Sequence, residues 1–186
     1  MKIQLLLLAF SVIFVTACKK DDPIPDGKAT LQYDGANATG PLLAAGYHEL
    51  AVYFPSATMS AYKDWKLKEV TWFMGGFPDS CVVKIYDEGT SDTPGALLYE
   101  EDVTGTTVVN DWQEHLLPTP LTVTGDGIWI SIALRHDIEK QSIGCDSGPN
   151  RANGDWLYQD SDQDWLTYFQ RTQESVNWNI RTKVEQ

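Results

Sequence analysis

The chain has 186 residues, with 26 Asp and Glu against 14 Lys and Arg, and a formal net charge of −12. This length suits one domain, and the acidity argues against nucleic acid as a partner, because phosphate contacts require clustered Lys and Arg. The same charge argues against binding to anionic lipid, so we expect membrane contact through an anchor only.

The first residues have the features of a secretory signal. Lys2 precedes the apolar run Leu5–Val15, which is shorter than the about 20 residues that span a membrane but has the length of a signal core. Small residues then precede Cys18, and this resembles the lipobox of bacterial lipoproteins. We therefore expect residues 1–17 to be a signal peptide and Cys18 to be lipidated. Ordinary secretion, with Cys18 as a free thiol, is the alternative.

A tether is expected at residues 18–29. The charged patch Lys19–Asp22 is followed by two prolines and a glycine, a composition that cannot pack into a core. The patch also resembles the Lys-plus-acidic signal that follows the lipid cysteine in a group of Gram-negative anaerobes. The resemblance implies an outer-membrane lipoprotein exposed on the cell surface, and an orientation toward the periplasm stays open.

Residues 30–186 are expected to form one all-β domain. Short alternating or β-branched runs recur between turns rich in Gly, Pro, Asn and Asp, which predicts a sandwich or barrel. Ile128–Leu134 is apolar at nearly every position and predicts a central strand covered on both faces. A helical turn is expected at Thr58–Trp65. The expected strands are Leu31–Asp34, Tyr47–Phe54, Leu67–Met74, Cys81–Asp87, Leu97–Val103, Trp112–Leu117, Leu121–Thr124, Ile128–His136, Trp156–Gln159, Trp165–Phe169 and Val176–Val184.

Five motifs occur in a characteristic order, namely VKIYDEGTSDTPGALLYEEDV, DWQEHLLPTPLTVTGDGIWISI, CDSGP, GDWLY and NWNIR. Their order and spacing resemble the gingipain-type adhesin modules, which are jelly-roll β-sandwiches. The usual Tyr-Asp-Gly-Gly turn is absent, because Glu88 and Gly89 follow Asp87. Those modules also usually belong to multidomain chains.

The resemblance implies a jelly-roll domain without catalysis that works as a surface adhesion or glycan-binding module. The expected partner is a glycan or a host or cell-surface protein, and a monomer is expected. Two other classes stay open, a small glycan-active hydrolase and a structural or accessory subunit of an outer-membrane surface complex.

Two further cysteines, Cys81 and Cys145, remain if Cys18 is lipidated. In an oxidising compartment they can form one disulfide, which would stabilise the fold by roughly 4 kcal/mol in the chain-entropy model. The alternative is a pair of buried thiols. A nucleophilic Cys145 would need a nearby base such as His136.

Catalytic and zinc-binding patterns are weak. His48, His115 and His136 fall on separate expected strands, without Cys or Asp at ligand spacing, so we do not expect a zinc site. Glu100 and Glu101 point to opposite faces of one strand. They therefore cannot form the facing pair of carboxyl groups that a glycosidase uses.

Calcium is the one cofactor hypothesis. Asp160, Asp162 and Asp164 alternate as in the first half of a calcium loop, and such oxygen ligands suit Ca²⁺. However, Trp165 and Arg171 stand where that loop has Gly and Glu. The alternative is an acidic hairpin turn.

Aromatic residues give the candidate binding face. Trp156 and Tyr158 lie two positions apart, so they share one face of a strand, and Trp165 begins the strand expected to pair with it. Asp146 in the preceding loop offers an oxygen acceptor. These planes suit a sugar ring or a peptide edge, and the alternative is that they cap the core. In that case, the site is expected around Asp87–Thr93.

Overall fold

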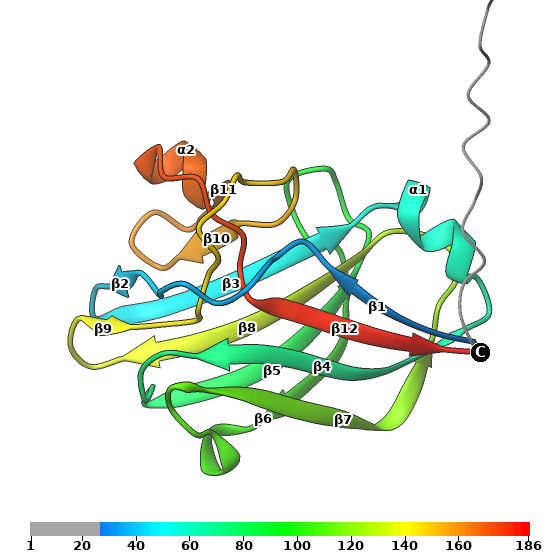
Figure 1. Ribbon diagram of the computed structural model, residues 1–186, viewed down its shortest axis with the longest axis horizontal. Helices are drawn as coiled ribbons and strands as arrows, with labels where there is room; N and C mark the ends of the chain where they lie inside the picture. The colour runs from blue at the N-terminus through cyan, green and yellow to red at the C-terminus, as the bar shows by residue number, and fades with distance from the viewer. Residues whose placement is uncertain (1–26) are drawn as a thin grey trace, which may run out of the picture.

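The computed structural model describes residues 27–186, which form an antiparallel β-sandwich (Figure 1). The expected signal peptide, the lipidated Cys18 and the charged patch Lys19–Asp22 lie outside the described residues. The first strand begins at Lys28, slightly before the boundary expected at residue 30.

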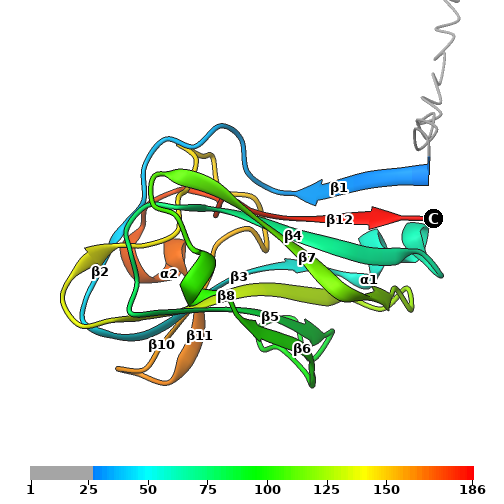
Figure 2. The same ribbon diagram turned by 90° about the horizontal axis from the view of Figure 1, so that it is seen from below.

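The two sheets pack face to face (Figure 2). Apart from the β10–β11 hairpin, the order β1-β12-β4-β7 opposite β3-β8-β5-β6 is that of a jelly roll, which confirms the expected fold. The four-stranded sheet contains β1 (Lys28–Gln32), β12 (Ile180–Glu185), β4 (Lys66–Met74) and β7 (Asp111–Thr122). The six-stranded sheet contains β11 (Asp164–Thr167), β10 (Trp156–Gln159), β3 (Gly46–Phe54), β8 (Ile128–His136), β5 (Ser80–Asp87) and β6 (Leu97–Asp102).

The core follows from strand alternation. On β5, Cys81, Val83 and Ile85 are buried between the sheets, while Lys84 and Tyr86 point outward and are partly exposed. The central strand β8 lies between β3 and β5 and is buried along nearly its whole length. The prediction of a strand covered on both faces is therefore confirmed.

Short elements connect the strands. They are the two-residue strands β2 (Leu42–Leu43) and β9 (Lys140–Gln141), the helices α1 (Ser56–Met59) and α2 (Tyr168–Thr172), and 3₁₀ turns at Ser60–Tyr62 and Thr104–Thr106. The expected helical turn near Thr58 is confirmed by α1 and the turn after it. Within residues 27–186, no helix is long and apolar enough to cross a membrane.

One expected break is absent from the structure. The separate strands expected at Trp112–Leu117 and Leu121–Thr124 are the single strand β7, although it contains Pro118 and Pro120. Both prolines lie between Leu116 and Leu121, where the register of β7 against β4 shifts, and β7 is the edge of its sheet. Proline is tolerated at such bulges and on edge strands.

Two expected strands are shorter than predicted. The strand expected at Trp165–Phe169 ends at Thr167, whose side chain caps α2 while the Gln170 side chain bonds back to the Thr167 backbone. This reciprocal capping box starts a helix where the apolar pattern alone indicated a strand. The strand expected at Val176–Val184 begins only at Ile180.

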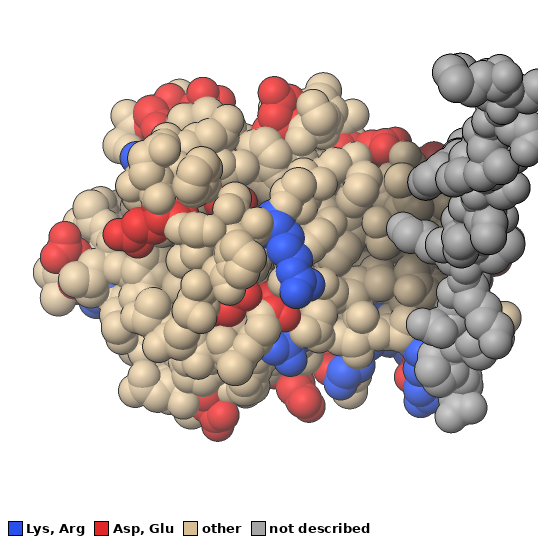
Figure 3. All heavy atoms as spheres, turned by 45° about the horizontal axis from the view of Figure 1, so that its top comes forward, with Lys and Arg blue, Asp and Glu red and all other residues tan. Residues whose placement is uncertain are grey.

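The outer face of the four-stranded sheet carries paired charges, and we call it the charged face. Glu185 on β12 forms ion pairs with Lys28, at 2.9 Å, and with Lys68. Lys183 pairs with Glu69 at 2.6 Å. In Figure 3, blue and red atoms accordingly lie next to one another across the lower front of the molecule.

Candidate functional site

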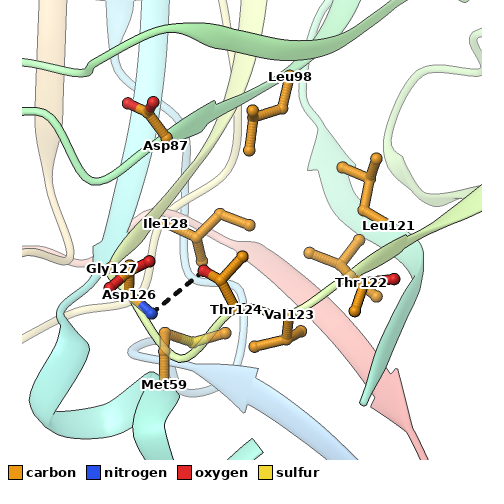
Figure 4. Close-up of a pocket in the computed structure, with 11 residues that line it drawn as sticks. Met59, Asp87, Leu98, Leu121, Thr122, Val123, Thr124, Asp126, Gly127 and Ile128 are labelled. Carbon is orange, nitrogen blue, oxygen red and sulfur yellow. Dashed lines mark hydrogen bonds between the residues drawn. The ribbon is translucent and has the colours of Figure 1, made fainter. Parts of the chain in front are cut away.

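A first hollow lies at one end of the sandwich and has a volume of about 250 Å³ (Figure 4). One hydrogen bond, from the Asp126 backbone to Thr124 Oγ1 at 3.3 Å, joins its lining residues. Its walls are mainly apolar, and its polar lining residues are Asp87, Thr122, Thr124 and Asp126. The lining residues are Met59, Leu67, Asp87, Leu98, Leu121, Thr122, Val123, Thr124, Asp126, Gly127 and Ile128.

The second hollow, which we call the aromatic pocket, lies on the outer face of the six-stranded sheet and has a volume of about 270 Å³. In Figure 2, the β10–β11 hairpin and the β5–β6 hairpin both project away from the four-stranded sheet. The pocket lies between them. Its lining residues are Tyr47, Glu49, Tyr86, Pro94, Gly95, Tyr158 and Trp165.

Strand register brings these side chains together. Tyr158 on β10 pairs with Glu49 on β3 on one side and with Trp165 on β11 on the other. The three residues therefore form one row across three strands, and directly opposed residues point to the same face of a sheet. Tyr47, two positions before Glu49, shares that face, and its ring centroid lies 6.1 Å from that of Tyr158.

A buried aromatic layer supports the pocket. Trp129 on β8 has no exposed surface, and its ring centroid lies 5.2 Å from Trp156, 5.7 Å from Trp165 and 4.7 Å from Tyr53. Its indole nitrogen donates to the Glu88 carbonyl oxygen at 2.9 Å. Trp129 therefore connects the hairpin on one side of the pocket to the loop on the other.

The loop between β5 and β6 forms the opposite wall. An Asp87 carboxylate oxygen accepts from the Ala96 backbone at 2.7 Å, and the Gly95 N–H donates to the Asp87 carbonyl oxygen at 3.3 Å. A Cβ atom at Gly95 would lie 1.7 Å from that carboxylate oxygen, so only glycine fits. Gly89 has a φ of +57°, which also favours glycine. These restraints hold Pro94 against the pocket.

Glu49 lies at the base of the pocket and is only 4% exposed. Its carboxylate accepts from the hydroxyl groups of Tyr47 (2.5 Å), Tyr86 (2.7 Å) and Ser131 (2.7 Å), and Lys84 Nζ lies 3.6 Å away. Burial, and then the neighbouring Glu49, raise the pKa of both tyrosines well above the ordinary value. Both hydroxyl groups therefore stay protonated as donors.

The structure brings together three of the four residues expected to bind a ligand. Tyr158 and Trp165 line the pocket. Trp156 lies against Trp129 and is only 7% exposed, so it supports the pocket from beneath. No residue of the second expected location, Asp87–Thr93, lines this pocket, although Pro94 and Gly95, which follow that range, do. Asp87 lines the hollow at the end of the sandwich.

Five lining residues were not predicted from the sequence, namely Tyr47, Glu49, Tyr86, Pro94 and Gly95. Tyr47, Glu49 and Tyr86 lie on β3 and β5, which are not adjacent in the sheet, since β8 lies between them. Alternation within each strand shows that Tyr47 and Glu49 share a face. It does not show which strands are neighbours.

Asp146, the fourth residue expected to bind a ligand, does not line this pocket. Asp146 is buried, and its carboxylate accepts from the backbone N–H groups of Gly35, Gly148 and Asn177 at 2.8–2.9 Å. Burial alone would raise the pKa of Asp146, but hydrogen bonds from Asn177, Gly148 and Gly35 outweigh it and lower the pKa. Its oxygens are used to join loops, so they are not available to a ligand.

The structure gives no support to the calcium hypothesis. Asp162 forms an ion pair with Arg171, whose guanidinium also donates to the Asp164 carbonyl oxygen at 2.8 Å. In residues 27–186, no group of three or more His, Cys, Asp or Glu side chains is placed to hold a metal ion. Asp160, Asp162 and Asp164 thus belong to a hairpin turn in which Arg171 binds the central acid.

The described histidines have separate environments. The rings of His48 and His136 lie 5.9 Å apart and are buried, a contact that the sequence did not indicate. His115 Nε2 lies 2.7 Å from the Tyr99 hydroxyl oxygen.

The disulfide hypothesis is also corrected, because Cys81 and Cys145 are free, buried thiols. They have different neighbours, with Thr107 beside Cys81 and Asp146 beside Cys145. Burial raises the pKa of Cys81 to about 12 and that of Cys145 to about 11. Neither thiol is therefore a thiolate near neutral pH, as a cysteine nucleophile must be.

Comparison with known proteins gives a structural likeness only. No family model matches the chain, and no curated protein matches it. A clostridial cysteine protease, Cwp84 after propeptide cleavage, has a TM-score of 0.61 and 11% identity, over 86% of this chain and 40% of that chain. A structure of the cysteine protease and lectin-like domains of Cwp84, a surface layer associated protein of Clostridium difficile, has the same score and identity over 86% and 36%. The chain thus spans less than half the length of either, and the likeness shows the fold.

Proposed function

We propose that the protein is a non-catalytic surface module that binds a glycan in the aromatic pocket. The observation that carries the proposal is the row of Glu49, Tyr158 and Trp165 across three strands, opposite the rigid loop at Pro94. Aromatic planes can pack against the C–H face of a sugar ring, while tyrosine hydroxyl groups bond to its hydroxyl groups. The hollow is open and shallow, which suits one or two sugar units of a longer chain.

The structural likeness supports this choice. The region of Cwp84 that the chain resembles is described as lectin-like, and that protein is associated with a surface layer. The sequence features of residues 1–22 agree with a lipid-anchored protein displayed on the outer membrane. We therefore propose the cell surface as its location.

The composition of the pocket favours binding over hydrolysis. Glu49 is the only acid among the described residues that line it, whereas glycosidases use two facing carboxyl groups. Glu49 is also saturated by donors, so it is poorly placed to exchange a proton with a substrate. The buried, protonated Cys81 and Cys145 argue against thiol chemistry.

A glycan array tests the proposed function. We would apply the chain without residues 1–18 and compare it with the variants Trp165→Ala and Trp112→Ala. Loss of the Trp165 ring should weaken binding by about 1–3 kcal/mol, or about 5- to 150-fold, as for other interface anchors. Trp112 is a matched control because it lies on the charged face, against Arg181.

Two results would reject the proposal. One is the absence of any glycan bound by the unsubstituted chain. The other is a Trp165→Ala variant that binds normally but melts at a lower temperature, since Trp165 would then only cap the aromatic layer.

Fractionation of cells tests the proposed location. Cys18→Ala should release the protein from the membrane fraction, and replacing Lys19–Asp22 with alanines should remove its accessibility to protease on whole cells. Unchanged membrane partitioning of Cys18→Ala would contradict lipid anchoring.

A further inference from the structure

We infer that the aromatic pocket selects its ligand by hydrogen-bond direction. It takes a saccharide that donates hydroxyl or amino hydrogens to the base of the pocket, and it disfavours the same saccharide when a sulfate or carboxylate replaces those donors. This inference rests on the proposed function, because it takes the aromatic pocket as the glycan site.

Glu49 fixes the direction of the hydrogen bonds. A carboxylate only accepts, so the hydroxyl groups of Tyr47 and Tyr86 must donate to it. Each hydroxyl group has one hydrogen, and that hydrogen is already used. Both phenol oxygens can therefore only accept a further hydrogen bond. The Tyr47 oxygen already accepts one from Lys84 Nζ at 3.1 Å.

Further donors surround Glu49. The Ser131 hydroxyl donates to its carboxylate at 2.7 Å, and Lys84 Nζ lies 3.6 Å from it. The raised pKa of Tyr47 and Tyr86 keeps both phenols protonated across the physiological range. Both phenols therefore keep the hydrogen that each donates to Glu49.

The opposite wall does not add free backbone donors. The Gly95 N–H is already bonded to the Asp87 carbonyl oxygen, and Pro94 has no N–H group. The Tyr158 hydroxyl has no hydrogen-bond partner among the described residues and can donate or accept. Tyr47 and Tyr86 therefore set the preference at the base of the pocket.

An anionic group placed there would bring oxygen acceptors against oxygen acceptors. Such a contact forms no hydrogen bond, and the nearby Lys84 ammonium is already directed at Tyr47 and Glu49. A neutral hydroxyl or an ammonium group instead donates to Tyr86 directly. We expect neutral and amino saccharides to bind at least about tenfold more tightly than sulfated or carboxylated forms.

The test uses an array of glucose, galactose and mannose glycans, each in neutral, amino, sulfated and uronic-acid forms, with the chain lacking residues 1–18. A tenfold preference for the neutral or amino form of each bound sugar is expected. Equal or tighter binding of the sulfated or uronic-acid form overturns the inference and leaves the proposed function standing. The absence of all binding overturns both.

Two variants link the preference to Glu49. In Glu49→Gln, the amide can donate to a tyrosine oxygen, and the tyrosine hydroxyl can then turn its own hydrogen toward the ligand. The ratio of the affinity for neutral forms to that for anionic forms should therefore fall from about ten toward one. Tyr86→Phe keeps the ring and removes the main free acceptor, so it should weaken the neutral forms several-fold and leave the anionic forms nearly unchanged. If Glu49→Gln does not fold, Tyr86→Phe still tests whether the base of the pocket sets the preference.

Tyr99→Phe on β6 is the matched control, since its hydroxyl contacts Glu101 and His115. It should keep the preference of the unsubstituted chain. A Tyr86→Phe variant with an unchanged preference and an unchanged melting temperature would overturn the inference.

Discussion

The two outer faces of the sandwich are built on the same strand alternation but have opposite chemistry. The charged face carries ion pairs such as Lys183–Glu69, whereas the outer face of the six-stranded sheet carries Trp129, which has no exposed surface. The difference comes from the β10–β11 hairpin and the β5–β6 loop, which cover the second face. A hairpin added to a jelly roll has thus created a second, smaller apolar layer outside the sandwich core.

This difference implies different energetics. Ion pairs near water contribute about 0–1 kcal/mol each, and salt weakens them. Burial of a whole aromatic side chain contributes several times more and hardly responds to salt. The pocket therefore lies on the face where the contacts are strongest.

The largest effect should come from Trp129→Ala. This substitution removes a fully buried ring that contacts Trp156, Trp165 and Tyr53, and we expect the free energy of unfolding to fall by about 3–5 kcal/mol. Urea denaturation measures this free energy of unfolding. The matched change on the charged face is Trp112→Ala, which removes a half-buried ring under Arg181 and should cost about 1 kcal/mol. Equal losses in the two variants would show that the aromatic layer is not a second core.

An intermediate effect is expected from Gly95→Ala. The new methyl group would overlap the Asp87 carboxylate, so the loop must move, and we expect a loss of about 1–3 kcal/mol in stability together with weaker glycan binding. Calorimetry and the array measure the two effects. Gly105→Ala is the control, because its methyl group would meet no atom within 4 Å. A Gly95→Ala variant that behaves like the control would show that the loop does not shape the pocket.

The smallest effect concerns the charged face and its response to pH. Hydrogen bonds from Lys68, and then from Lys28, lower the pKa of Glu185 to about 2 from its ordinary value of 4.5. The folded state therefore favours the charged form, so this contribution to stability is present above about pH 4.5 and is lost as the pH falls toward 2.

Carbon-13 NMR titration of the Glu185 carboxyl group measures its pKa directly. Lys68→Ala should raise the pKa toward its ordinary value, and so should about 1 M salt, which shortens the screening length to about 3 Å. An ordinary pKa in the unsubstituted chain would contradict the ion pairs described for this face.

Strands and their order along the chain could be predicted because turn residues and β-branched runs are local signals. Ile128–His136 and Trp156–Gln159 were predicted with the bounds that the structure has. The break expected near Pro118 is a register shift within the single strand β7. Proline is tolerated there because β7 is an edge strand, and edge position depends on the whole sheet.

The site was predictable only where its contacts are local. Tyr158 and Trp165 lie on one hairpin, so alternation was sufficient to bring them together. Glu49 and Tyr86 enter through pairing between strands far apart in the chain, which no local pattern specifies. The hydrogen bonds of Asp146 could not be predicted, because its partners, Gly35 and Asn177, come from opposite ends of the domain.

The pairing of the first described strand with the last has a mechanical consequence. β1 runs antiparallel to β12 from Lys28, opposite Glu185, to Gln32, opposite Arg181, and the Gln186 N–H donates to the Gly27 carbonyl oxygen at 2.8 Å. The hydrogen bonds of such a ladder lie across the strand direction. A pull on residue 27 along the axis of β1 therefore acts in shear and loads all of these bonds together, whereas a perpendicular pull would open them one at a time. If the proposed lipid anchor at Cys18 holds the protein, the fold should resist tension best when the pull lies along β1.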